Sequence, residues 1–431
     1  MKSATALVLI ACVGLVGCAT LDAGPPDTAY QATLGEVAVV ATEQSPTLGF
    51  HGFAHGKGEG ALTGAGGTFA ACLSGGGGGC SGSACGAALL LMLGICGVAG
   101  LVGGIAGAAE APDASVAAAS EARLAQAVEI RTVQAALRDQ VFAAAQLRGA
   151  HLRNVPPALA QEAAATGDYR SFAEFGVDSV VETGLVEAGT RGSGINAPVG
   201  VHLRARVRVL ATADNGERLV ADYLYQGRHR RLAEWAADDG RPLKTELEAG
   251  YHALGEHIYE QVFELLPLPD RRAHSAGGAL STAFGLAPIS PPTRGQLSGE
   301  SVLGDLFEWT AVDTLRPTLQ WQAFPRAGDV AVAPAEMARV REVGYDLVIA
   351  QEMNQAPERI VYRRQALPAP EHRLETALQP GTRYFWTIRS RFRLDGRTRL
   401  TEWGSTRALG GDSVVAPSAF AYRFRTTKSA Y

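Results

Sequence analysis

Four of the six cysteines, which all lie in the first hundred residues, are the side chains best suited to form a disulfide or metal site. They follow one another as Cys-x7-Cys, Cys-x4-Cys and Cys-x10-Cys, with no histidine between them. No usual zinc site has these spacings. We therefore expect disulfides or buried thiols rather than a metal site, and the sequence does not choose among the three pairings that four cysteines allow. The four residues are Cys72, Cys80, Cys85 and Cys96.

The other polar residues form no catalytic motif. The tripeptide at residues 192–194 lacks the spacing of a nucleophile elbow, and His-Glu-x-x-His does not occur. Glu234, Asp238 and Asp239 precede an amphipathic segment, where the helix dipole favours acids, so we interpret them as capping and turn residues. The sequence predicts no catalytic residue, no metal site, no cofactor and no enzymatic activity.

The N-terminus determines which compartment the chain reaches. Lys2 precedes an apolar run over residues 4–16, which is short for a bilayer span and typical of a signal-peptide core. The run ends in Leu15-Val16-Gly17-Cys18. This resembles the lipobox of bacterial lipoproteins and implies removal of residues 1–17 and acylation of the Cys18 thiol. In such lipoproteins Ala19, rather than aspartate, implies delivery to the outer membrane. There we expect the protein to face the periplasm, with display at the cell surface as the alternative. The oxidising periplasm favours disulfides.

A glycine-rich region with one strongly apolar segment follows the predicted tether over residues 18–34. It covers residues 35–111, and a helix over residues 84–109 would be about 39 Å long. Small residues spaced by four within it resemble the glycine-zipper segments of envelope proteins and imply a homo-oligomer in the membrane. A helical hairpin buried in a soluble body is the alternative. The small residues are Gly100, Gly103, Gly104 and Gly107.

Residues 112–266 have the pattern of an α+β domain, an antiparallel sheet with helices on one face. Apolar residues at odd positions 201–209 alternate with His202, Arg204, Arg206 and Arg208, which predicts a strand with one buried and one basic face. The segment after the turn at residues 214–216 returns as its partner, with Asp222 able to face an arginine. We interpret the basic face as a solvated row paired with cross-strand acids; binding of an anionic lipid or glycan is the alternative.

One helix is predicted before this hairpin in the sequence and another after it. Apolar residues recur at helical spacing over residues 114–149 and 241–266. Residues 177–188 are predicted to form a further strand. The domain is loosely similar to periplasmic lipoprotein domains of the curli-secretion and TolB N-terminal type, which begin with a short valine-rich strand. Here residues 37–40 would be that strand.

A Pro- and Gly-rich linker over residues 267–299 precedes an all-β module over residues 300–431. Its pieces, in chain order, are strands at residues 317–321 and 345–349, a corner at residues 380–384 that ends in Tyr384, the tripeptide at residues 403–405 and a last strand at residues 422–426. Their order resembles a fibronectin type III sandwich, which implies that the Tyr384 hydroxyl bonds nearby backbone. Arg389, Arg391 and Arg393 are interpreted as a surface row, with a polyanion-binding face as the alternative.

The composition of the chain argues against one class of partner. The chain has 431 residues, of which 47% are hydrophobic, and its net charge of −4 argues against a nucleic-acid partner. We predict a non-enzymatic, lipid-anchored envelope protein that binds an envelope protein or a glycan, or acts as a scaffold. The alternative is a component of an outer-membrane secretion or pore assembly that inserts the glycine-rich helix.

Overall fold

The computed structural model describes residues 28–50, 57, 59, 62, 105–106, 109, 111, 113–128, 130–192, 195–269, 285–292, 309–353, 356–405, 412–418 and 421–428. The chain divides into two compact units. One covers Ala29–Phe263, and the other covers Glu264–Tyr431 together with Met1–Thr28. Helices and sheets are mixed, so the fold class is α+β.

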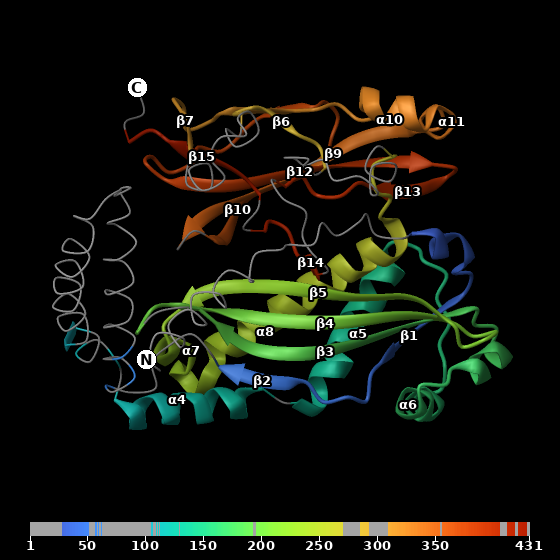
Figure 1. Cartoon of the computed structure of the whole chain (residues 1–431), viewed down its shortest axis with the longest axis horizontal. Helices are drawn as coiled ribbons and strands as arrows, with labels where there is room; N and C mark the ends of the chain where they lie inside the picture. Colours follow the sequence, from blue (N-terminus) through green and yellow to red (C-terminus); the bar gives the residue numbers. More distant parts are fainter. Residues whose placement is uncertain are drawn as a thin grey trace, which may run out of the picture. The chain divides into compact units, whose positions relative to one another are not determined.

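A twisted sheet forms the centre of the first unit (Figure 1). Its strands β3 (Ser179–Arg191), β4 (Val199–Ala211) and β5 (Glu217–Arg230) are antiparallel neighbours. Two short strands, β1 (Val37–Ala41) and β2 (Thr47–Phe50), pair one after the other with β3 on the side away from β4. The predicted buried face of β4 is confirmed, because its five apolar residues at odd positions 201–209 are each at most 1% exposed.

The predicted sheet was wholly antiparallel, and this was wrong: β1 and β2 pair with β3 in parallel, so the sheet is mixed. The strand predicted at residues 37–40 is confirmed as β1, and β2 comes from the region predicted to be glycine-rich. The cause is the chain between β2 and β3, which contains α4 (Ala114–Ala127), α5 (Ile130–Leu147) and α6 (Pro157–Thr166). A helical crossover of this kind returns the chain in the parallel direction.

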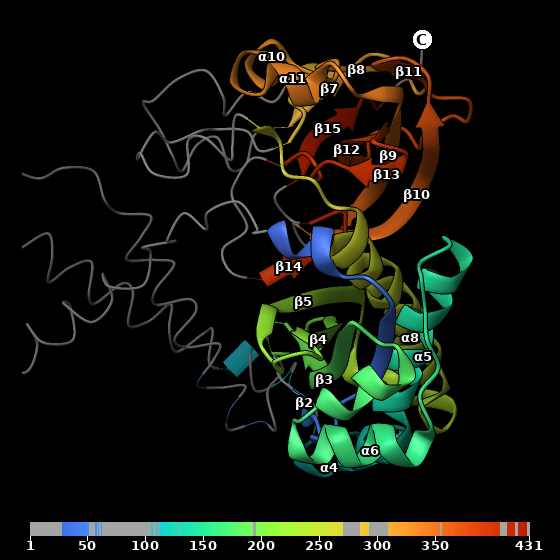
Figure 2. The same cartoon turned by 90° about the vertical axis from the view of Figure 1, so that its right-hand side faces the viewer.

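Two helices cover one face of this sheet. Figure 2 shows α5 and α8 (Ala237–Tyr259) on the same side of β3, β4 and β5. At Gly255 a Cβ atom would lie 2.6 Å from the Cβ atom of Gln140 in α5, so glycine permits the close crossing. The predicted helix over residues 114–149 is divided at residue 128 into α4 and α5. The predicted apolar stripe is confirmed as buried: Leu243, Leu247, Tyr251, Leu254, Ile258, Val262 and Leu265.

The acids at and just before the start of α8 have the capping and turn roles that the sequence predicted. Glu234 accepts a hydrogen bond from the Arg231 N–H at the start of α7 (Leu232–Trp235). Asp238 and Asp239 occupy left-handed backbone positions, with φ of 49° and 55°. The unit also contains the short helices η1 (Ala29–Thr33) and η2 (Arg170–Phe175), and the π-helical turn η3 (Glu260–Glu264) follows α8.

The second unit contains two sheets around one aromatic core. One sheet has the order β11-β8-β6, and the other has the order β10-β9-β12-β15-β7 with β13 added to β12. β6 lies within the segment predicted to be linker. Trp321, Tyr345, Tyr384 and Trp386 belong to the buried core. The elements are β6 (Pro288–Ser290), β7 (Thr310–Val312), β8 (Thr318–Trp321), α10 (Ala327–Val332), α11 (Pro334–Met337), β9 (Arg341–Met353), β10 (Ala356–Leu367), β11 (Glu371–Arg373), β12 (Arg383–Leu394), β13 (Arg397–Leu400), β14 (Asp412–Val414) and β15 (Tyr422–Thr426).

Candidate functional site

The sites that the sequence singled out for lipidation, disulfides and helix association lie outside the described residues. These are Cys18, the four cysteines Cys72, Cys80, Cys85 and Cys96, and the glycines Gly100, Gly103, Gly104 and Gly107. They stay predictions. The described residues contain no group of three or more His, Cys, Asp or Glu side chains that could hold a metal ion.

The basic row on β4 is paired with acids on both neighbouring strands, as predicted. Arg206 Nε lies 2.7 Å from Asp222 Oδ1, directly across the β4–β5 register. Arg208 reaches Glu182 on β3 and Glu217 on β5, at 2.9 Å each. These matched charges identify a structural row rather than an open anion-binding face.

His202 departs from that row because it is buried. His202 is 5% exposed, and its Nε2 atom lies 3.9 Å from Glu187 Oε2. In the described part of the chain, this Nε2 atom has no hydrogen-bond partner. Burial, and then the positive charge of Arg191, lower the pKa of His202 to about 4. The imidazole is therefore neutral in the folded protein near pH 7.

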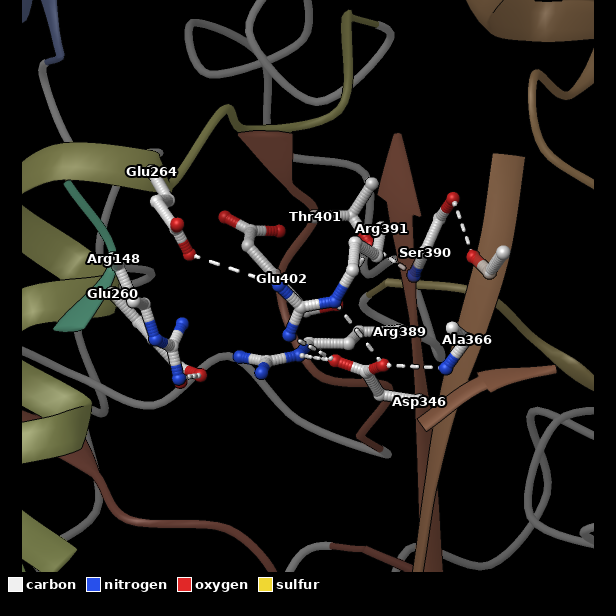
Figure 3. A network of polar contacts seen from close by, with 11 residues as sticks. Arg148, Glu260, Glu264, Asp346, Ala366, Arg389, Ser390, Arg391, Thr401 and Glu402 are labelled. Atoms are coloured by element: carbon white, nitrogen blue, oxygen red, sulfur yellow. Dashed lines mark hydrogen bonds and ion pairs between the residues drawn. The ribbon is translucent and has the colours of Figure 1, made fainter. Parts of the chain in front are cut away.

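The basic row on β12 was predicted to lie on the surface, and for two of its members this was wrong. Figure 3 shows the Asp346 carboxylate between Arg389 and Arg391. Arg389 is 3% exposed and its Nε lies 3.0 Å from Asp346 Oδ2, while Arg391 Nη2 lies 2.9 Å from the same oxygen. The Arg389 guanidinium also stacks on Trp403, 4.2 Å from the ring centroid. Only Arg393 is exposed.

Both faces of β12 are covered in its middle, which is why the row is not solvated. Phe385, Thr387 and Arg389 are buried on one face, as are Tyr384 and Trp386 on the other. A buried guanidinium needs a carboxylate partner, and Asp346 on the adjacent strand β9 supplies it. The signal in the sequence is a single acid, Asp346, within the otherwise apolar run 345–349.

The first unit contains a cavity of about 220 Å³ beside β1. Residues of β1, α5 and α6 line it, and these include Val39 and Ala41 of β1, Phe142 of α5 and Ala160 of α6. Arg138 and Arg153 add positive charge to the lining. Each has an acid nearby: Arg138 Nε is 2.8 Å from Asp139, and Arg153 Nε is 3.1 Å from Glu36.

The outer edge of β1 opens into this cavity. The Val37 N–H and C=O point away from β3, because they bond the His151 C=O and the Arg153 N–H at 2.9 Å each. The Thr42 N–H bonds the Thr183 C=O of β3 instead. Backbone groups alternate along a strand, so those of Val39 and Ala41 point outward like those of Val37. Within the described ranges, no hydrogen bond joins either residue to a group on that side.

None of the helices in the described ranges combines the length and hydropathy that a membrane crossing requires.

Comparison with known proteins finds similarity to solved structures only. No protein-family model and no curated protein matches the chain. Among solved structures, the chain is similar to the lipoprotein GNA1162 from Neisseria meningitidis, with 13% identity over 27% of this chain and 83% of that chain, at a TM-score of 0.19. Because this TM-score is low, the function of this protein rests on its own residues.

Proposed function

We propose that the protein is a non-enzymatic, lipid-anchored component of the bacterial outer membrane that faces the periplasm and binds an extended segment of an envelope protein. The lipobox-like sequence that ends at Cys18 supports the anchor and the compartment. The binding role rests on one observation, which is the outward-facing backbone of Val39 and Ala41 at the cavity beside β1.

An extended peptide fits this edge because it satisfies the open backbone groups. The backbone of a strand added beside β1 would accept hydrogen bonds from the N–H groups of Val39 and Ala41 and donate hydrogen bonds to their C=O groups. Its side chains would alternate, and those on the cavity side would contact Phe142, Val155 and Ala160. Such a mode takes affinity from backbone hydrogen bonds and specificity from the apolar cavity.

We also propose that residues 300–431 form a fibronectin type III-like sandwich. Two sheets support this, because the three-stranded sheet β11-β8-β6 and the six-stranded sheet β10-β9-β12-β15-β7, with β13 beside β12, face a common core. The Tyr384 hydroxyl accepts a hydrogen bond from the Gln379 N–H at 2.9 Å, which is the corner that the resemblance implied. Modules of this kind are mostly binding scaffolds, although a fold alone does not determine function.

The anchor is tested by following the lipid. Cells grown with labelled palmitate should label the wild-type chain, and the protein should enter the detergent phase on phase partition. Replacing residues 1–18 with a cleavable secretory leader should abolish labelling and move the protein to the aqueous phase, because several acyl chains are needed for stable anchoring. Cys12→Ala, which lies within the predicted leader, serves as the control and should label normally.

Two outcomes would change this proposal. An unlabelled wild-type chain with an unmodified Cys18 would remove the lipid anchor. A leader-replaced variant that stays in the detergent phase as oligomers would instead favour the secretion or pore assembly, through Gly100, Gly103, Gly104 and Gly107.

The binding edge is tested by removing one donor. Val39→Pro removes an outward N–H that takes no part in the β1–β3 ladder, so the sheet can form without it. A photo-crosslinking amino acid at Gln161, an exposed residue that lines the cavity, reports the partner in cells. We expect about ten-fold less crosslinked product with Val39→Pro, from a lost backbone hydrogen bond and the proline ring beside the added strand.

Val39→Ala is the matched control, because it loses the same side chain and keeps the N–H. Equal crosslinking by the Pro and Ala variants would rule out strand addition at this edge. Both variants should keep the wild-type circular dichroism spectrum, and a Pro variant that does not is replaced by Ala41→Pro with its own control, Ala41→Gly.

A further inference from the structure

Three arginines gather on one face of the sheet at the end of β12 away from Arg389. Arg383 lies directly opposite Arg425 in the β12–β15 register, and Arg423 lies opposite Phe385. All four side chains share a face, because Tyr384 and Phe424 between them belong to the core. Like charges directly opposite each other destabilise an antiparallel sheet. The arrangement therefore has a cost that the fold alone does not explain.

Several other strand arginines of this protein have acids beside them. Arg389 and Arg391 share Asp346, and Arg206 and Arg208 on β4 have Asp222, Glu182 and Glu217. Arg383 and Arg425 are both exposed. In the described part of the chain, neither makes an ion pair or a side-chain hydrogen bond with a carboxylate. These two side chains are available to an anion from outside.

Aromatic rings hold two of the guanidinium groups in place. The Arg383 and Arg423 guanidiniums each lie 5.5 Å from the Trp309 ring centroid. Trp309 itself meets Phe385 edge-on, with ring centroids 5.2 Å apart. Cation–π contact fixes the orientation of the Arg383 guanidinium while leaving its N–H donors for a ligand. The half-exposed Trp309 ring adds an apolar surface next to the charges.

We propose that the face formed by Trp309, Arg383, Arg423 and Arg425, here called the Trp309 face, binds an acidic polysaccharide whose sugars carry carboxylates. Guanidinium groups pair with carboxylates through two parallel hydrogen bonds. Side chains directly opposite on adjacent strands have Cβ atoms only about 5 Å apart, so Arg383 and Arg425 converge on one carboxylate. A sugar ring beside that carboxylate packs on the edge of Trp309.

This inference goes beyond the proposed function, since it concerns a different unit and a different ligand. Nucleic acid is a poor fit, because its recognition needs an extended basic surface and the whole chain carries a net charge of −4. A polysaccharide needs only a few arginine–carboxylate pairs, which the Trp309 face can supply.

The test measures binding of the detergent-solubilised full chain to immobilised polygalacturonate, with neutral dextran as the reference. We expect salt-sensitive binding to polygalacturonate and none to dextran. The double variant Arg383→Gln/Arg425→Gln should bind about ten-fold or more weakly, as the loss of charge-assisted hydrogen bonds implies. Trp309→Ala should weaken binding by about three-fold through lost positioning.

The matched control is Arg170→Gln/Arg218→Gln, which makes the same change in net charge at exposed arginines paired with Asp168 and Asp214. It should bind like the wild type. Equal losses in the two double variants would mean that net charge alone governs binding, and the Trp309 face would have no role. No binding to polygalacturonate, or binding only to vesicles that contain phosphatidylglycerol, would also overturn the proposal.

Discussion

Replacing Asp346 with alanine is expected to lower the free energy of unfolding of the C-terminal unit by about 3–5 kcal/mol. Asp346 is 1% exposed and receives both Arg389 and Arg391, and one of its oxygens also accepts the Ala366 N–H at 3.2 Å. Without this carboxylate, the buried Arg389 guanidinium loses the acceptor that lies 3.0 Å from its Nε atom. The cost comes from leaving buried N–H donors and their charge less compensated more than from the lost attraction, because buried ion pairs contribute little net stability.

Urea unfolding followed by circular dichroism measures this effect. Asp395→Asn is the control, since Asp395 pairs with Arg339 at the surface, where both side chains are more than half exposed, and asparagine tolerates the left-handed backbone of this position, with φ of 52°. Its change should stay below about 1 kcal/mol. The double variant Asp346→Leu/Arg389→Met should recover most of the stability lost by Asp346→Ala, because it removes the two most buried charges together and leaves only Arg391, whose side chain is 23% exposed. Equal unfolding of the Asp346→Ala and Asp395→Asn variants would show that Asp346 is solvated and that the ion pairs are not buried.

Strands and helices with one buried face and one solvent-exposed face, such as β4 and α8, could be predicted from the sequence. β4 has strict alternation, so Val207 points to the core and Arg206 meets Asp222 as expected. The stripe of α8 repeats at helical spacing and is buried throughout. In both cases the pattern within one element carries the information, because solvent lies on the other side.

Features that depend on distant partners could not be predicted in this way. Nothing near Val37 in the sequence indicates that it pairs with Ser179, and this pairing makes the sheet mixed and creates the open edge of β1. Alternation on β12 suggested a solvated row at Arg389, yet the strand is covered on both faces and Asp346 compensates the charge. His202 fits the alternating pattern of β4 but lies in a buried part of its polar face.

His202 should make the first unit lose stability as the pH falls from about 6.5 to about 4. Burial lowers the pKa of this imidazole to about 4 in the folded protein, from an ordinary value of 6.5. Between these values the unfolded chain takes up a proton that the folded chain excludes, so protonation favours unfolding. The contribution is fully present above pH 6.5 and is lost progressively below it, up to about 3 kcal/mol.

Urea unfolding of the wild type and of His202→Gln at pH 7, 6, 5 and 4 isolates this contribution. Carboxylates that do not contact residue 202 titrate alike in both proteins, so the difference between the two pH profiles belongs to His202 and its coupling to the Glu187 carboxylate. The profile of the variant should be flatter by about 2–3 kcal/mol over this range, whatever its stability at pH 7. His252→Gln, at an exposed position with 66% of its side chain accessible, should follow the wild-type profile. Parallel profiles for the wild type and His202→Gln would mean that the imidazole is protonated as readily in the fold as in the unfolded chain, which a buried ring beside Arg191 and Arg204 does not allow.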